Sequence, residues 1–298
     1  MTTPLINPEP QRPRRNWLLR YLGVQEKYDY AIRVALQDAS EDAFRGIRDR
    51  AGDDRIGASA RRYQLQLAAK AAKSAINGLF KTINTTIREG QAAAAVAATE
   101  AGFVSDQRVL QRLFPDRQIR ESYQESMVES ASRGVQAMMT RILVSHIPLS
   151  QQVYKTERLA NGDVDRIVNS ALVRGDSAMD IARKVRDSIN PDVVGGVSYA
   201  ARRLGRTELN NAFHAQSIAD VEDKPWIDYV VWKLSKVHEP QGCKCEVYAR
   251  QGRFQKENIP EKPHPQCLCY IAPVANDWDE FKSNLLAGIY NDYIDKHL

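Results

Sequence analysis

Two short segments near the carboxyl end, Cys243-Lys244-Cys245 and His264-Pro265-Gln266-Cys267-Leu268-Cys269, contain all four cysteines of this 298-residue chain. Thiols paired on two separate arms, with a histidine three residues before one of them, are donors that a tetrahedral zinc ion prefers. The predicted metal ligands are Cys243, Cys245, His264, Cys267 and Cys269. Two other states of the cysteines stay open, namely free thiols in a small core and two disulfides between the pairs.

Five candidate ligands exceed the four positions around a tetrahedral ion, so one of them is a bystander. Residues i and i+2 of a strand face the same side, which lets each cysteine pair present two sulfurs together. Because Cys-x-Cys is less usual than Cys-x-x-Cys in structural zinc sites, Cys245 or Cys269 is the first ligand to omit. His238 is a sixth and weaker candidate.

A catalytic metal ion would need an open coordination position with an acid or base beside it. Three glutamates lie near the cysteines in the sequence, but charged loop residues are commonly solvated. They are Glu239, Glu246 and Glu261. The sequence therefore predicts a structural site and no catalytic residue.

Helical periodicity dominates the rest of the chain, because apolar residues recur at steps of three and four. It predicts long helices at 17–50, 56–101 and 117–146, and further helices at 163–173, 176–190, 198–221 and 277–297. Residues 229–234 are rich in β-branched and aromatic side chains and predict a strand, and 245–248 and 270–274 can add two more. The expected fold class is mostly α, with long N-terminal helices and a small C-terminal α+β module whose short antiparallel sheet surrounds the Cys/His cluster.

Four parts of the chain are expected from its composition. Proline clusters at the start predict an extended arm over 1–15, because proline has no amide hydrogen and restricts its own φ. The other parts are a long-helix domain at 16–150, an α+β domain at 155–275 and a C-terminal helix at 276–298.

Charge and hydropathy exclude some classes of protein. A net charge of +5 is modest for this length and does not by itself indicate a nucleic-acid binder. Charged residues interrupt the segment after Arg14-Arg15, so we expect no export signal. The longest uncharged candidate for a membrane span, 91–99, is far shorter than the roughly 20 residues that a bilayer requires. A globular protein without a membrane span is expected.

A polar group, Arg206, Glu208 and Asn210, interrupts a helix that is otherwise apolar. Buried charges need partners, and the guanidinium group of Arg206 is expected to reach backbone oxygens of the following sheet. A structural polar clasp is preferred here to a catalytic acid.

Several motifs occur in a specific order along the chain. They are Gly175-Asp176-Ser177, Asp180-Ile181-Ala182, Arg206-Thr207-Glu208-Leu209-Asn210 with Ala212, Trp232, Cys243, and His264-Pro265-Gln266-Cys267-Leu268-Cys269. Over about residues 160–274 this order resembles the phage head morphogenesis family, the minor head proteins related to phage Mu protein F. Leu268 stands where that family usually has arginine, and Cys243-Lys244-Cys245 departs from the usual first pair. Both departures concern the metal ligands.

The resemblance implies a structural minor head protein of a tailed bacteriophage, and not an enzyme. Such a protein is made in the host cytoplasm, joins the portal vertex during procapsid assembly and is retained in the virion, in the head interior or at the portal vertex. Its expected partners are the portal protein, the major capsid or scaffolding protein, and packaged double-stranded DNA.

Two other functions are compatible with the same motifs. A metal-dependent nuclease or hydrolase acting on phage DNA would need an acid or base beside the metal. A zinc-stabilised DNA-binding module would show steep salt dependence of its DNA affinity, although no helix of the sequence carries arginines clustered on one face.

Overall fold

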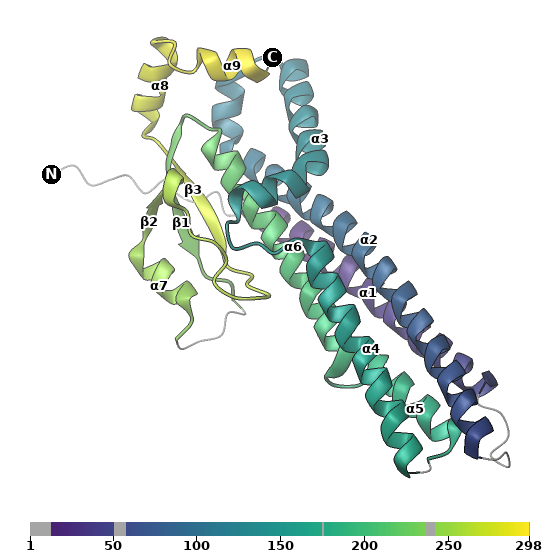
Figure 1. The fold of residues 1–298 in the computed structure, drawn as a ribbon. Coiled ribbons are helices and arrows are strands. Elements are labelled where there is room, and N and C mark those ends of the chain that lie inside the picture. The colour runs from purple at the N-terminus through teal and green to yellow at the C-terminus, as the bar shows by residue number, and fades with distance from the viewer. Residues whose placement is uncertain (1–12, 51–57, 175, 237–241, 298) are drawn as a thin grey trace. The chain divides into compact units, whose positions relative to one another are not determined.

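The computed structural model describes residues 13–50, 58–174, 176–236 and 242–297. Most of the predicted proline-rich arm, Gly175, His238 and Glu239 lie outside these described residues. The fold class predicted from the sequence is confirmed: long helices occupy the N-terminal part, and a small antiparallel sheet lies near the carboxyl end (Figure 1).

The long helices follow one another in the order that the periodicity predicted, whereas α7, β2 and η1 were not predicted. The helices are α1 (Pro13–Arg50), α2 (Ala58–Leu113), α3 (Arg117–Ile142), α4 (Leu149–Arg174), α5 (Ala178–Ile189), α6 (Gly196–Glu222), α7 (Lys244–Gln251), η1 (Lys256–Asn258), α8 (Trp278–Leu286) and α9 (Asn291–His297). The strands are β1 (Ile227–Lys233), β2 (Arg253–Gln255) and β3 (Tyr270–Ala275). The helix predicted for 277–297 is divided into α8 and α9 at Gly288, whose φ of 74° is a left-handed conformation that favours glycine.

Two compact units are built from segments that are not consecutive in the sequence. The first, the sheet unit, comprises 1–25, 91–144 and 210–298, and the second, the helical unit, comprises 26–90 and 145–209. The long helices α1, α2 and α6 each contribute residues to both units. The units therefore cut across the domain boundaries predicted from the sequence.

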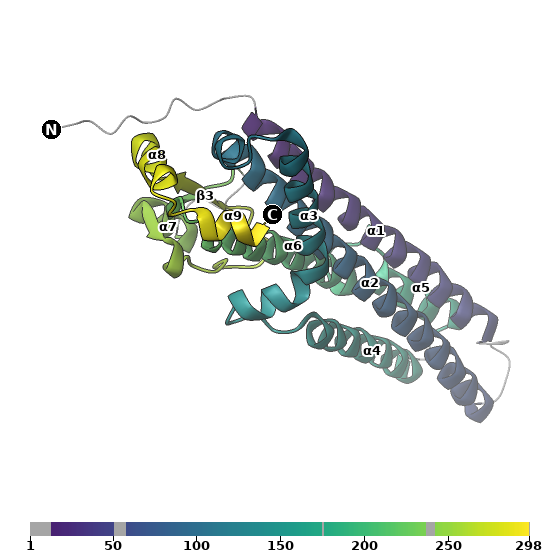
Figure 2. The same cartoon turned by 90° about the horizontal axis from the view of Figure 1, so that it is seen from above.

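In the helical unit, parts of α1 and α2 run alongside one another, together with α4 and α5 (Figure 2). The apolar stripe predicted for α1 is buried from Ile32 through Leu36 to Ile47, and α2 buries Leu65, Ile76 and other residues at the same helical spacing. Burial of these stripes holds the long helices together, because apolar surface removed from water contributes about 25 cal/mol per Å².

Close packing in the helical unit depends on glycine at one position of α2. A Cβ atom at Gly90 would lie 2.7 Å from Leu209 Cδ1 and 3.1 Å from Tyr28 Cγ. A Cβ atom at Gly78, in the same helix, would meet nothing within 4 Å. The two glycines therefore separate the effect of helix propensity from the effect of packing.

We expect Gly90→Ala to lower the free energy of unfolding by about 1–2 kcal/mol, because overpacking outweighs the helix propensity that alanine adds. The control Gly78→Ala should raise it by as much as ~1 kcal/mol. Urea denaturation followed by circular dichroism measures both changes. Equal stabilisation by the two substitutions would contradict the close contact at Gly90.

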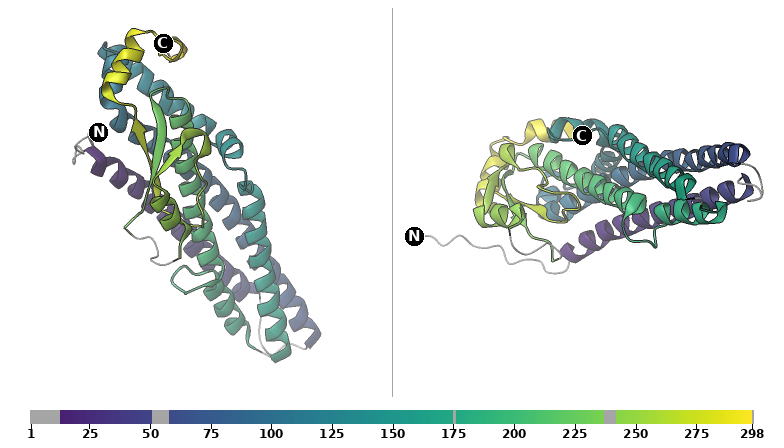
Figure 3. Two further views of the ribbon diagram at one scale, coloured as in Figure 1. Left: turned by 90° about the vertical axis from the view of Figure 1, so that its left-hand side faces the viewer. Right: turned by 60° about the horizontal axis from the view of Figure 1, so that its bottom comes forward.

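The sheet unit has β1 as its central strand, with the order β2-β1-β3 and antiparallel pairing on both sides. Val230 lies opposite Phe254 on one side and opposite Pro273 on the other. Figure 3 shows the three strands beside the carboxyl-terminal part of α6. The core between them contains Ile218, Val221, Trp226, Ile227, Val230 and Trp232.

The alanine-rich run of α2 lies in the sheet unit, where Ala94, Ala95, Ala97 and Ala98 are buried. Their small side chains suit close helix packing. The helices α8 and α9 add Phe281, Tyr290 and Tyr293 to the core, and the hydroxyl groups of Tyr123 and Tyr293 are 2.6 Å apart.

A group of buried charges lies at the end of α6. Lys224 Nζ is 2.6 Å from Asp106 Oδ2, and both side chains are 4% exposed. The buried carboxyl group of Asp220 accepts a hydrogen bond from Gln216 Nε2 at 2.7 Å and contributes a second negative charge beside Lys224. Gly102 leaves room for the lysine, since a Cβ atom there would lie 3.0 Å from Lys224 Nζ.

No helix in the described ranges is long and apolar enough to cross a membrane.

Candidate metal centre

The first cysteine pair lies at the start of a helix, and the strand predicted for 245–248 is wrong. Cys243 is the N-cap residue of α7, and its Sγ accepts a hydrogen bond from the Cys245 amide at 3.4 Å. Glu246 follows in the first turn of α7, where a negative charge interacts favourably with the helix dipole and stabilises the helix. These local signals outweigh the β-propensity of Val247 and Tyr248.

The second pair directly precedes β3, the strand that the sequence predicted at 270–274. Gln266 has a φ of 59°, a left-handed turn that redirects the chain immediately before Cys267. The Cys269 Sγ accepts a hydrogen bond from the Ser235 amide at 3.4 Å, just after β1. Loop and sheet together fix the positions of these two sulfurs.

The two arms meet at Cys245. Its Sγ lies 3.4 Å from Cys267 Sγ and 3.7 Å from His264 Nε2. The donor atoms form two sets, and within each set all atoms lie within 4.8 Å of one another. One set is Cys243, Cys245 and His264, and the other is Cys245, Cys267 and Cys269. All five predicted ligands are therefore brought together, and all four cysteines are free thiols rather than disulfides.

Cys245 belongs to both sets of donors, although the sequence indicated Cys245 or Cys269 as the first ligand to omit. It is fully buried, as are Cys267 and Cys269, whereas Cys243 and His264 are more accessible to solvent. The buried sulfurs form the inner part of the cluster, and either Cys243 or His264 can supply the fourth donor.

Burial and mutual hydrogen bonding set the protonation of the three inner thiols. Burial raises the pKa of Cys245 to about 12. A hydrogen bond with Cys269, together with burial, raises the pKa of Cys267 above its ordinary value. The hydrogen bond from Cys267, together with the Ser235 amide, lowers the pKa of Cys269 to about 5. One thiolate is therefore stable at neutral pH, and the other sulfurs need a cation to lose their protons.

The ring of His264 is oriented through its other nitrogen. His264 Nδ1 lies 2.9 Å from the Pro265 carbonyl oxygen, which can only accept, so Nδ1 carries the proton in this contact. Nε2, 3.7 Å from Cys245 Sγ, is then the nitrogen with a free lone pair. A metal-binding histidine is commonly oriented in this way, by a carbonyl oxygen that accepts a hydrogen bond from the ring nitrogen that does not bind the metal.

A shell of buried groups that the sequence did not single out surrounds the sulfurs. Lys262 Nζ donates a hydrogen bond to the Cys269 carbonyl oxygen and lies 5.8 Å from the centre of the Trp232 ring. Burial lowers the pKa of Lys262, and the charges of the neighbouring thiolates oppose that change. His214 Nε2 forms a 2.9 Å hydrogen bond with the Pro260 carbonyl oxygen, and the His214 ring makes an edge contact with Trp232.

This arrangement could hold a metal ion. Thiolate and imidazole donors suit soft or borderline ions such as zinc, and four protein donors would close a tetrahedral shell. For the acid or base that a catalytic ion would need, the described candidates are Glu246 in α7 and Glu261 before the second pair, both half-buried. Glu239 lies outside the described residues.

The polar residues of α6 each contact another helix of their own unit. Arg206 Nε is 3.0 Å from Asp29 Oδ1 of α1, a carboxylate that it shares with Arg202. Hydrogen bonds and charges from these two arginines overcome the effect of burial and lower the pKa of Asp29. The sequence predicted backbone oxygens of the following sheet as partners of Arg206, and did not indicate its contact with Asp29.

Glu208 and Asn210 have different partners from Arg206. The buried carboxylate of Glu208 accepts a hydrogen bond from Gln152 Nε2 at 3.0 Å, and His146 Nε2 lies 3.9 Å from it. Asn210 Oδ1 accepts hydrogen bonds from Tyr21 and from Gln25 Nε2, both on α1. The contacts thus join α6 to α1 and to residues near α4.

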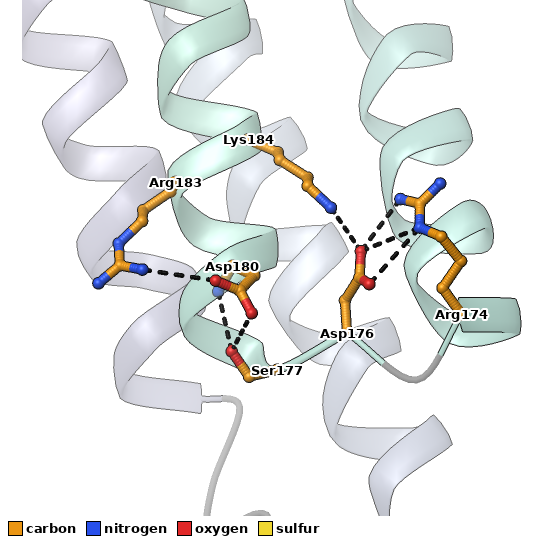
Figure 4. Close-up of polar contacts among 6 residues, drawn as sticks. All are labelled: Arg174, Asp176, Ser177, Asp180, Arg183 and Lys184. Carbon is orange, nitrogen blue, oxygen red and sulfur yellow. Dashed lines mark hydrogen bonds and ion pairs between the residues drawn. The ribbon is translucent and has the colours of Figure 1, made fainter.

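The Asp176-Ser177 motif forms the junction between α4 and α5 (Figure 4). Asp176 Oδ2 accepts hydrogen bonds from Arg174 Nη2 at 3.0 Å and from Lys184 Nζ at 2.5 Å, which lower the pKa of Asp176 to about 2. Ser177 caps α5: its Oγ accepts from the Asp180 amide at 3.1 Å and donates to the Asp180 carboxylate at 2.7 Å.

We expect Ser177→Ala to lower the free energy of unfolding of the helical unit by about 1 kcal/mol, because one amide in the first turn of α5 loses its acceptor. Ser177→Thr keeps the hydroxyl group and should cost less than half as much. Chemical denaturation of the two variants checks this order. Equal stability of wild type and Ser177→Ala would show that the cap contributes nothing.

Comparison of the chain with protein-family models, with curated proteins and with solved structures finds no match. The order of the motifs along the chain and the geometry of the cysteine arms are therefore the basis for any proposal about function.

Proposed function

We propose that the cysteine arms bind one zinc ion in a structural site, through Cys245, Cys267, Cys269 and His264. The 3.4 Å separation of the Cys245 and Cys267 sulfurs supports this ligand set, because sulfurs that share a tetrahedral ion with bonds of about 2.3 Å lie at comparable distances. The tautomer of His264 leaves Nε2 free to bind. Four protein donors leave no open position for a substrate, which favours a structural ion over a catalytic one.

We further propose that the protein is a minor head protein of a tailed bacteriophage, bound to the portal vertex during procapsid assembly and retained in the virion. The observation that carries this proposal is the order of its motifs, from Asp176-Ser177 through Arg206 to the second cysteine pair. Each motif makes contacts within the fold: the first caps α5, the second joins α6 to α1, and the third lies beside the sheet. Such roles are structural, in agreement with a protein used in assembly.

Binding to the cognate portal tests this function. The full-length chain, tagged and purified, is mixed with portal rings from the same phage, and the complex is isolated by size-exclusion chromatography. We expect stable association, and mass spectrometry of purified virions should detect the protein. Absence of the protein from virions, together with no portal binding, would overturn the proposal.

A parallel titration with double-stranded DNA separates the assembly role from a DNA-binding module. A module that binds the phosphate backbone loses affinity steeply as salt rises, by several orders of magnitude between roughly 50 and 200 mM for 6–10 phosphate contacts. For an assembly protein we expect portal binding that persists over this range and DNA binding that is weaker than portal binding. Cleavage of the DNA by the zinc-loaded protein would instead favour the nuclease.

A further inference from the structure

One lysine of the loop before the second cysteine pair contacts the backbone of that pair. Lys262 Nζ donates to the carbonyl oxygen of Cys269 and lies 5.8 Å from the centre of the Trp232 ring. Trp232 is 1% exposed and belongs to the core of the sheet unit. The ammonium group therefore lies against the inside of the module, where a charge is costly unless an opposite charge faces it.

The groups around Lys262 show which charge that is. Among the described residues, Lys262 forms no ion pair with a carboxylate. His214, which packs on Trp232, is neutral because burial and the charge of Lys262 lower the pKa of His214 to about 3. The groups whose negative charges would act on Lys262 are the sulfurs of Cys245, Cys267 and Cys269 once they are ionised.

We propose that Lys262 is a positioning residue of the metal centre, whose ammonium group supplies the counter-charge for three thiolates bound to a divalent ion. Three thiolates exceed the charge of zinc by one unit, and a single ammonium group restores neutrality within the buried module. A neutral histidine as fourth ligand keeps that balance, whereas a fourth thiolate from Cys243 would exceed it. This inference rests on the proposed zinc site and explains its ligand set.

Two variants separate the charge of Lys262 from its hydrogen bond. Lys262→Gln keeps a donor group and removes the charge, and Lys262→Met removes both. The probe is zinc alone, titrated into the metal-free full-length protein against a chromophoric chelator at pH 7. We expect both variants to bind zinc roughly tenfold to a hundredfold more weakly than wild type, which is the usual effect of losing a group that contacts the metal ligands.

Two controls show whether the effect belongs to the charge. Cobalt in place of zinc should give the same thiolate charge-transfer intensity in wild type and both variants, because the ligands are unchanged. The metal-free form of Lys262→Met should unfold at the same urea concentration as metal-free wild type or at a higher one, since it no longer buries an ammonium group. A purely packing role would destabilise metal-free and metal-loaded protein equally.

The outcomes distinguish the two proposals. Wild type that binds no zinc would overturn the zinc site, and the role of Lys262 with it. Wild type that binds zinc, with Lys262→Gln binding equally tightly, would leave the zinc site standing and overturn the counter-charge.

Discussion

Cys245→Ser is expected to abolish stoichiometric zinc binding and to destabilise the sheet unit more than any other single cysteine substitution. The reason is its position: Cys245 Sγ is the donor atom common to both sets of candidate ligands. Its removal leaves only two donors in each of the two sets. Elemental analysis of the purified protein measures the zinc, and thermal unfolding measures the stability.

The size of the effect follows from linkage between binding and folding. A ligand that binds only the folded state stabilises it by about 2.7 kcal/mol at a free concentration 100-fold above Kd and by about 4.1 kcal/mol at 1,000-fold. Wild type in excess zinc should therefore be more stable than Cys245→Ser by about 3–4 kcal/mol. After addition of a strong chelator most of this difference should disappear, because the serine replaces a thiol that no longer holds an ion.

Cys243→Ser is the matched comparison. Cys243 is half-buried, and serine is a good N-cap residue, so α7 keeps its cap. With His264 as the fourth ligand, Cys243→Ser should retain one zinc ion per chain. A full zinc content in Cys245→Ser, or a stability difference that survives chelation unchanged, would contradict a site centred on Cys245.

Local patterns in the sequence sufficed for most of the fold. The helical stripe of α1 and the strand at β3 depend on side chains close together in the chain, and both were predicted nearly at their final bounds. Only the second half of α4 was predicted, because polar residues and Gly162 weaken the periodicity before residue 163. In the folded chain Leu149, Val153 and Ala160 are buried, and this packing makes the first half helical.

The candidate site was predictable in its composition but not in its geometry. Clustering of the cysteines identified the five donors, since no other part of the chain offers thiols. The choice of strand for 245–248 failed because a cap and a charged first turn outweighed the β-propensity of two residues, Val247 and Tyr248. Lys262 and Ser235 carry no sequence signal for a role at the site, since their contacts arise only when loop and sheet fold together.

Buried charge pairs are the features that sequence patterns reveal least. Asp106 and Lys224 are separated by more than one hundred residues. The residues next to each of them in the sequence do not distinguish it from an exposed charged residue. Their contact could not have been inferred without the fold. It nevertheless belongs to the part of the sheet unit where a substitution should have one of its largest effects.

Lys224→Met should lower the free energy of unfolding by about 3–5 kcal/mol, because it leaves buried carboxylates without their cation. Burial by itself would lower the pKa of Lys224, but the charges of Asp106 and Asp220 outweigh it and raise that pKa. The lysine therefore stabilises the folded protein at and below its ordinary pKa of 10.5, and this contribution is lost only as the pH rises through the higher folded value. Urea denaturation at pH 7 measures the loss.

The same substitution at an exposed ion pair is the control. Lys282 lies 3.2 Å from Asp279, with both side chains more than half exposed, and Lys282→Met should change stability by no more than about 0.5 kcal/mol. A loss at Lys224 no larger than that at Lys282 would contradict a buried, uncompensated pair of carboxylates.

The pH dependence of the Lys224→Met variant gives a second test of the same charges. Burial raises the pKa of Asp220, and Lys224 opposes this change, so removal of the lysine should raise that pKa further. A carboxyl group with a raised pKa costs stability only when it is ionised, so the cost is present above its folded pKa and is relieved as the pH falls through that value. The deficit of Lys224→Met relative to wild type should therefore shrink between neutral pH and the ordinary aspartate value of 3.8. A deficit that stays constant over this range would mean that the lysine acts by packing its stem and not through its charge.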